Sequence, residues 1–115
     1  MPTPFNHRQE SRVEFLGEQD GPPERLLKAD LATTLGRYRA IRRAYLARVG
    51  FQPEAMVSVA LCVAPATAED TSVVRSVGEI FSRHAGPAAH LDVVFVTDEQ
   101  EVDLRRVCRP FFERK

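Results

Sequence analysis

Two segments of the chain carry apolar side chains at consecutive positions. Residues 56–64 (MVSVALCVA) contain no charged side chain, and residues 90–97 (HLDVVFVT) are apolar on both alternating faces. A strand with one face in water alternates apolar and polar side chains, whereas a strand covered on both faces need not. We therefore predict that both segments are neighbouring strands of one sheet, sandwiched between other layers.

The first strand is predicted over residues 12–17. There Val13 and Phe15 alternate with charged neighbours, which is typical of a half-buried or edge strand. The preceding residues, 1–11, include two prolines and follow no period, so we expect a flexible arm. Residues 12–115 are expected to form a single α+β domain, long enough to fold without disulfide or metal.

Residues 41–49 are open to two interpretations. Ile41, Tyr45 and Val49 could continue the apolar stripe of a preceding helix, because Ala, Leu and Arg are good helix formers. Gly36 favours an earlier end of that helix. We therefore predict a strand over 41–49 and a loop over 50–54. The strand would place Ile41, Tyr45, Ala47 and Val49 on one side and Ala44 and Leu46 on the other.

Three helices are predicted from apolar stripes with helical spacing. The first begins at Pro22-Pro23 and ends near residues 36–39. The second runs from about Thr71 to Gly86, and the last begins at Thr97-Asp98 and ends or kinks near Arg109. Their stripes are Leu27, Leu31, Leu35 and Tyr38; Val73, Val77, Ile80 and Phe81; and Leu104, Val107, Cys108 and Phe111.

The predicted elements follow the order β-α-β-β-α-β, with an additional C-terminal helix. This order is that of a ferredoxin-like, or split βαβ, four-stranded sheet. Its two crossover helices would cover one face of the sheet. The apolar second face then needs either the last helix or a second copy of the protein to cover it.

The charges of the chain balance, with 16 Lys and Arg against 16 Asp and Glu. There is thus no overall field to hold nucleic acid or an anionic membrane, and binding there would need a local patch. One candidate anion patch has five arginines in twelve residues with no acid among them. It could instead be a solvated rim around a helix end, which zero net charge favours. Its members are Arg37, Arg39, Arg42, Arg43 and Arg48.

The candidate metal ligands and nucleophiles have simpler explanations. Cys62 and Cys108 both fall at apolar positions, as buried free thiols do, so we expect a reducing compartment. The histidines lack metal-ligand spacing to Cys or carboxylates, and we expect no metal or cofactor. These histidines are His7, His84 and His90.

Four acidic residues crowd the start of the last predicted helix. Carboxylates there complement the positive end of the helix dipole, which explains them without acid–base catalysis. They are Asp98, Glu99, Glu101 and Asp103. At the other end of that segment, Phe111 and Phe112 follow Pro110. We expect these rings to anchor the tail by packing, and they are our candidate interaction surface.

Several segments together resemble one known family. They are Phe15-Leu-Gly17, Pro23 with its leucine-rich helix, Ala44-Tyr-Leu-Ala47, residues 91–96 (LDVVFV) and the terminal residues 109–114 (RPFFER). Over about residues 12–115, in this order, the chain resembles the C-terminal domain of the bacterial SseB family, named for enhanced serine sensitivity. The resemblance implies a bacterial cytoplasmic protein without catalytic residues to carry over, and it supports a strand over 41–49. The family usually has another domain ahead of this one, so roles that need both domains are not expected here.

These observations lead to an expected function. We expect a non-enzymatic module that contacts a protein partner or another copy of itself, such as a homodimer. The alternative is a regulatory domain that senses a small ligand, for example an amino acid; an enzyme comes third. No apolar leader is present at the N-terminus and the longest uncharged stretch, 55–68, is too short to cross a bilayer, so we expect a cytoplasmic protein.

Overall fold

The computed structural model describes residues 12–52, 57–86, 89 and 91–114. The predicted arm over residues 1–11, part of the predicted loop and strand over 53–56, and His90 lie outside the described residues. The described part is a mixed α/β fold with a sheet and three α-helices. Its elements are β1 (Arg12–Glu18), α2 (Pro22–Leu35), β2 (Arg43–Gln52), β3 (Val57–Ala64), the 3-10 helix η1 (Ala66–Ala68), α3 (Thr71–Ala85), β4 (Asp92–Phe95), α4 (Asp98–Arg105) and β5 (Phe112–Glu113).

The strands lie side by side in sequence order, β1-β2-β3-β4. β1 and β3 both pair with β2 in antiparallel fashion, and β4 pairs with β3 in parallel fashion. The ferredoxin-like arrangement is therefore not confirmed, because β3-α3-β4 joins adjacent parallel strands with no strand between them. The short β5, which the sequence did not predict, pairs with β2 at Arg43 and Ala44.

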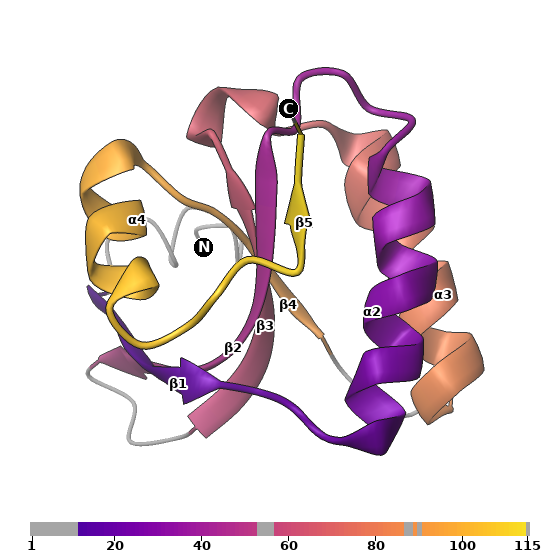
Figure 1. Ribbon diagram of the computed structural model, residues 1–115, viewed down its shortest axis with the longest axis horizontal. Coiled ribbons are helices and arrows are strands. Elements are labelled where there is room, and N and C mark those ends of the chain that lie inside the picture. Colours follow the sequence, from indigo (N-terminus) through magenta and orange to yellow (C-terminus); the bar gives the residue numbers. More distant parts are fainter. Residues whose placement is uncertain (1–11, 53–56, 87–88, 90, 115) are drawn as a thin grey trace, which may run out of the picture.

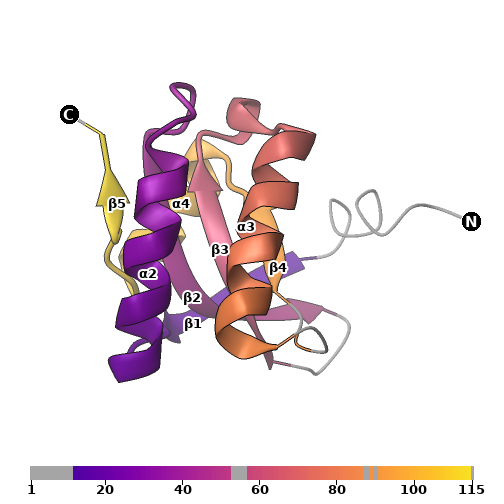
Figure 2. The same ribbon diagram turned by 90° about the vertical axis from the view of Figure 1, so that its right-hand side faces the viewer.

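The sheet lies between two helical layers. α2 and α3 run side by side over one face, and α4 lies over the other (Figures 1 and 2). On the first side, Leu31, Leu35 and Val77 pack with Leu46 and Leu61 of the sheet. On the second side, Leu104 and Cys108 pack with Tyr45, Val49 and Cys62. The last helix thus covers the second face, as one of the two predicted alternatives requires.

The helices begin and end at residues suited to those positions. Asp70 caps α3 and accepts a hydrogen bond from the Ser72 N–H at 2.8 Å. Gly86 ends that helix with a φ of 91°, which favours glycine. α4 begins with a reciprocal pair in which Thr97 and Gln100 each bind the other's backbone N–H, at 2.9 and 3.2 Å. These contacts confirm the predicted entry points of both helices.

Several predicted boundaries are wrong. β2 begins at Arg43 and continues to Gln52, so the predicted loop over 50–54 begins too early. Ile41 precedes the strand in a turn, where its N–H donates to the Tyr38 carbonyl, and it packs on the side of Ala44 instead of Tyr45. α4 ends at Arg105, short of Arg109, and Val107, which was predicted on the apolar stripe of this helix, follows the helix and is exposed.

The two most apolar segments are adjacent strands, as predicted, but only one is interior. β3 has a partner on each side, and its residues from Ala60 to Ala64 are buried. β4 is shorter than predicted, and all four of its residues are half-buried. This difference follows from its position at the edge of the sheet.

Candidate functional site

A buried ion pair joins α4 to the sheet. Arg43 Nε and Nη2 donate to the two carboxylate oxygens of Glu101 at 2.5 and 3.0 Å. The hydroxyl of Tyr45, which is fully buried, donates to the same carboxylate at 2.5 Å. Glu101 is 6% exposed, and no other charged residue of the described chain is buried. The three side chains form a polar cluster at the border of an apolar layer, where the Arg43 side chain is 27% exposed. We call it the Glu101 cluster.

The charges of the Glu101 cluster are fixed by its own contacts. The hydrogen bonds from Arg43 hold the pKa of Glu101 below its ordinary value, although burial alone would raise it. Burial, together with the bond to Glu101, raises the pKa of Tyr45. The carboxylate therefore stays ionised and the phenol stays protonated at neutral pH. General acid–base catalysis needs a group with a pKa near the working pH, and neither side chain has one. The contacts of the cluster instead hold α4 against the sheet.

The sequence contained a signal for this cluster that the prediction did not use. Glu101 lies three residues before Leu104 on the buried face of α4, and Cys108, which follows the helix, packs in the same apolar layer as Leu104. An acid on a buried stripe requires a cationic or hydrogen-bonding partner. We assigned it, with Asp98, Glu99 and Asp103, only to the helix dipole. Those three are exposed, and only Glu101 faces the sheet.

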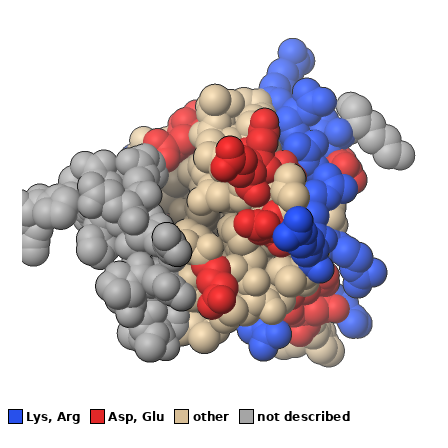
Figure 3. Space-filling model, turned by 90° about the vertical axis from the view of Figure 1, so that its left-hand side faces the viewer, with Lys and Arg blue, Asp and Glu red and all other residues tan. Residues whose placement is uncertain are grey.

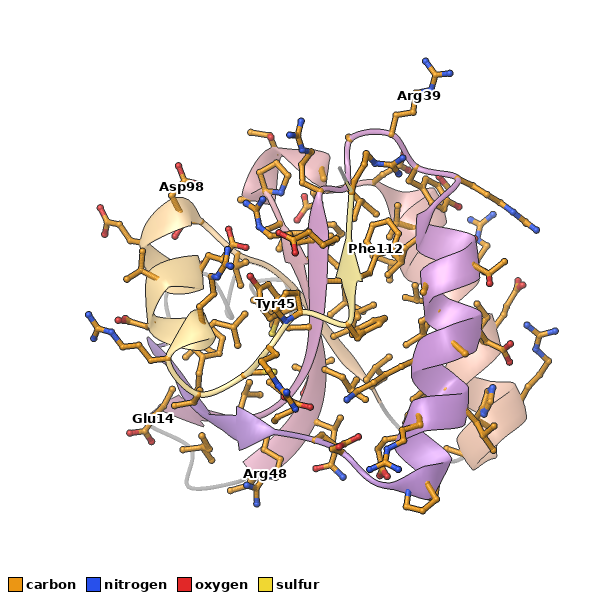
Figure 4. The ribbon with its side chains drawn as sticks, in the orientation of Figure 1. Glu14, Arg39, Tyr45, Arg48, Asp98 and Phe112 are labelled. Atoms are coloured by element: carbon orange, nitrogen blue, oxygen red, sulfur yellow. The ribbon has the colours of Figure 1, made fainter. Side chains whose placement is uncertain are left out.

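The structure does not bring the five arginines of the candidate anion patch together. Arg43 is taken up by Glu101. Arg39 and Arg48 lie at opposite ends of the molecule (Figure 4). Arg37, Arg39 and Arg42 remain in one short connection between α2 and β2, where all three are exposed. We call residues 36–42 the arginine loop.

Arg114 anchors the arginine loop from the C-terminal tail. Its guanidinium donates to three loop carbonyls, those of Ile41 at 3.0 Å and of Gly36 and Tyr38 at 3.1 Å each. Its backbone N–H donates to the Arg42 carbonyl at 2.8 Å. The same guanidinium lies 5.7 Å from the centre of the Phe112 ring. One side chain thus connects the tail to most of the loop.

Phe111 and Phe112 pack against the chain's own core. Both rings are half-buried and lie on the core layer beneath α2. The Phe111 N–H donates to the Ala44 carbonyl at 2.9 Å, and Phe112 pairs with Ala44 in the sheet. The rings therefore attach the tail to β2, as the sequence indicated, and a contact with a partner there stays a prediction.

The two cysteines are buried free thiols. Burial raises the pKa of Cys62, and burial raises the pKa of Cys108 to about 11. Both are therefore protonated at neutral pH, which makes them poor nucleophiles. In the described part of the chain, no three His, Cys, Asp or Glu side chains are grouped as metal ligands would be. His84 contacts Asp30 at 2.7 Å, which joins α3 to α2; His7 and His90 lie outside the described residues.

The outer edge of β4 has no strand partner among the described residues. Within the described residues, β4 pairs only with β3. The parallel register aligns Val63 with Phe95, and the Val96 N–H donates to the Val63 carbonyl at 2.9 Å. This pattern directs the backbone of Val94 toward β3 and turns the N–H and C=O groups of Val93 and Phe95 outward. The sequence did not predict this edge, because local patterns do not fix strand order.

The comparisons with known proteins identify one family. The model of the SseB protein C-terminal domain matches residues 8–114. Comparisons with curated proteins and with solved structures found no match. None of the helices in the described part of the chain is long and apolar enough to span a membrane. Since the family model covers nearly the whole chain, this protein belongs to the family of SseB C-terminal domains.

Proposed function

We propose that this domain is a non-enzymatic self-association module, in which the outer edge of β4 pairs with the same edge of a second copy. The observation that carries the proposal is the open, apolar edge formed by Val93, Val94 and Phe95. Both faces of the sheet are covered by helices of the same chain, and among the described residues the outward N–H and C=O groups of Val93 and Phe95 have no strand partner.

The two edges of the sheet differ in how they are protected. β1, at the far edge, is irregular at Leu16, where the pairing register shifts between Phe15 and Gly17. Bulges of this kind blunt an edge against further pairing. β4 has an uninterrupted register along Asp92–Phe95 and three consecutive apolar residues. Its edge is therefore the better template for another strand.

The β4 edge is also complementary to itself. An antiparallel pairing centred on Val94 places Val93 opposite Phe95 of the second copy, and the reverse. Because both residues turn their backbone groups outward, this register forms two hydrogen-bonded pairs. Asp92 then faces Val96 of the second copy, so no like charges meet. The arrangement has the two-fold symmetry of most soluble dimers and joins the two sheets into one.

The chemistry of the site residues supports a non-enzymatic role. The ionised Glu101 of α4 is buried, and its carboxylate accepts hydrogen bonds from Arg43 and Tyr45 of the sheet. The buried thiols have raised pKa values, which disfavours nucleophilic catalysis. Free thiols are also suited to a reducing, cytoplasmic setting, which we include in the proposal.

The alternative function, sensing of a small ligand such as an amino acid, would need a concave site with convergent polar groups. One hollow of the surface lies on the outer side of α3. It is open, and its lining residues all belong to that single helix: Arg75, Gly78, Glu79, Ser82 and Arg83. This hollow does not favour ligand sensing over self-association.

Charge substitutions at the symmetry centre test the proposal. In the proposed dimer the two Val94 side chains face each other, with Cβ atoms about 5 Å apart. Val94→Lys and Val94→Glu should each abolish the dimer that the wild type forms on concentration in sedimentation velocity. An equimolar mixture of the two variants should restore it, because Lys then faces Glu.

Two controls separate the interface from changes in the monomer. Val94→Gln introduces a side chain that is close in shape to glutamate but carries no charge. This variant should dimerise better than either charged variant. Val102→Lys adds a lysine at an exposed valine of α4, away from the edge, and should dimerise like the wild type. A wild type that stays monomeric, or a mixture that fails to restore the dimer, would refute the proposal.

A further inference from the structure

We infer that the arginine loop is a second binding surface, on which Arg37, Arg39 and Arg42 take an acidic, carboxylate-rich segment of another protein. This surface is separate from the β4 edge, and its function does not depend on dimerisation. Guanidinium groups suit carboxylates because each can donate two parallel hydrogen bonds to one carboxylate.

The arginine loop is held in one shape by contacts on its inner side. Ile41 is fully buried, and the Tyr38 hydroxyl bonds to the Ser76 hydroxyl at 2.9 Å and to the Ser72 carbonyl at 3.2 Å. Arg114 fixes three carbonyls of the loop from the opposite side. The loop therefore presents its outward side chains from a fixed backbone. Preorganisation of this kind reduces the entropy lost when a partner binds.

The three outward arginines have no acidic partner among the described residues. Arg37, Arg39 and Arg42 are exposed, and none of them forms an ion pair with another described side chain. Exposed arginines near a helix C-terminus can have a purely structural role, because their positive charge complements the negative end of the helix dipole. Here Arg114 already donates to the carbonyl of Gly36, the C-cap of α2. The loop arginines thus remain available to an external anion.

The surroundings favour an acidic protein segment over nucleic acid. Binding of single-stranded nucleic acid generally uses aromatic rings on which bases stack. Tyr38, the aromatic residue of the loop, is half-buried and tied to α3 through its hydroxyl. The chain has no net positive charge, so a partner of either class would have to be held by the local arginines and not by the overall charge.

Positive charge is nevertheless concentrated in space. On the side of the molecule that carries α4, Lys and Arg side chains form a band along one edge of the view, beside separate Asp and Glu side chains (Figure 3). A zero net charge therefore does not mean an even distribution of charge. Separated charges of this kind steer a partner's approach and orientation more than they add affinity.

A labelled hexaglutamate peptide is a direct probe of the arginine loop. Its affinity for the full chain is measured by fluorescence anisotropy at low salt, beside a twelve-nucleotide thymidine strand. Replacing Arg37, Arg39 and Arg42 together by Gln should weaken peptide binding about tenfold, the expected scale for three solvent-exposed charge pairs. Added salt should weaken binding to the wild type more than to this variant.

The matched control removes three other exposed arginines. Arg48, Arg75 and Arg83 are also exposed and without an ion pair among the described residues, and replacing them by Gln changes the net charge equally. This control should bind the peptide within about twofold of the wild type. The dimer-breaking Val94→Lys should also bind normally, so this inference and the proposed function can fail separately.

Three results would overturn the inference. The first is no binding of the peptide by the wild type at low salt. The second is an equal loss of binding in the control, which would indicate a general charge effect. The third is tighter binding of the thymidine strand than of the peptide, with the same dependence on the loop arginines, which would assign the surface to nucleic acid instead.

Discussion

Arg43 and Glu101, which lie 58 positions apart in the sequence, form a two-point ion pair between β2 and α4. Glu101 is buried, whereas the Arg43 side chain is 27% exposed. The pair therefore lies at the border of the second core layer, where its charges are only partly screened by water. With Leu104 and Cys108, it holds α4 against the sheet face that the helix covers.

Removing Arg43 should destabilise the fold much more than removing its neighbour. Arg43→Met leaves the Glu101 carboxylate buried without its cation, which we expect to lower the free energy of unfolding by about 2–4 kcal/mol. Arg42→Met, at an exposed position, should change it by less than about 0.5 kcal/mol. Urea unfolding followed by circular dichroism measures both. Equal changes in the free energy of unfolding for the two substitutions would show that the Arg43–Glu101 ion pair does not stabilise the fold.

The contribution of Glu101 should depend on pH. Its pKa in the folded chain lies below the ordinary value of 4.5, so the unfolded chain binds the proton more readily. The stabilisation is therefore complete above about pH 4.5 and is lost as the pH falls through the lowered pKa. Glu101→Gln should be less stable than the wild type at pH 7, and this difference should shrink between pH 5 and 3. A difference that is constant over this range in urea unfolding would contradict the assignment.

Both thiols should react slowly in the native protein. Cys62 and Cys108 are buried, and their raised pKa values leave little thiolate at pH 8. Alkylation by iodoacetamide, followed by mass spectrometry, should be slow in buffer and fast in urea. A cysteine introduced at the exposed Ser82 provides an internal reference and should react at once. Rapid native labelling of Cys62 would show that α4 does not cover the sheet as described.

The guanidinium of Arg114 should determine how firmly the arginine loop is held. Arg114→Lys keeps the positive charge but loses the planar fork that reaches three carbonyls. The loss of about 1.4 kcal/mol of local hydrogen bonding should speed exchange of the Ile41 amide about tenfold. Arg109→Lys, at a side chain that is 87% exposed, is the control and should leave this rate unchanged. Equal exchange rates of the Ile41 amide in the wild type and both variants would show that the Arg114 side chain does not hold the loop in place.

Local sequence patterns predicted most of the helices and strands but not how the strands are arranged. The prolines at the start of α2, the Asp70 cap and the Thr97–Gln100 pair each act within a few residues, so the pattern alone locates them. Strand order depends on contacts between distant segments, which no local period encodes. The mixed α/β fold is confirmed, whereas the ferredoxin-like arrangement, which was predicted from the order of elements along the chain, is not confirmed for this reason.

The candidate site was predicted less well, since its residues act through distant partners. Glu101 is a buried ion because α4 lies over Arg43 and Tyr45, which are distant from it in the sequence. Arg114 was treated as part of a terminal motif, although its carbonyl partners lie more than 70 residues earlier. The run of apolar residues in β4 was interpreted as coverage on both faces. In the structure, Val93 and Phe95 pack on one core layer and Val94 on the other, so both faces are covered, but the strand lies at the edge of the sheet, which the run of apolar residues does not indicate.

Amide hydrogen exchange along β4 tests self-association most directly. The Val96 amide donates to Val63 of β3 within one chain, so it should be protected at every protein concentration. The amides of Val93 and Phe95 point outward, and they should exchange fast in dilute protein and slowly in concentrated protein as strands pair. Fast exchange of Val93 and Phe95 at all concentrations, with the wild type remaining a monomer, would contradict the account.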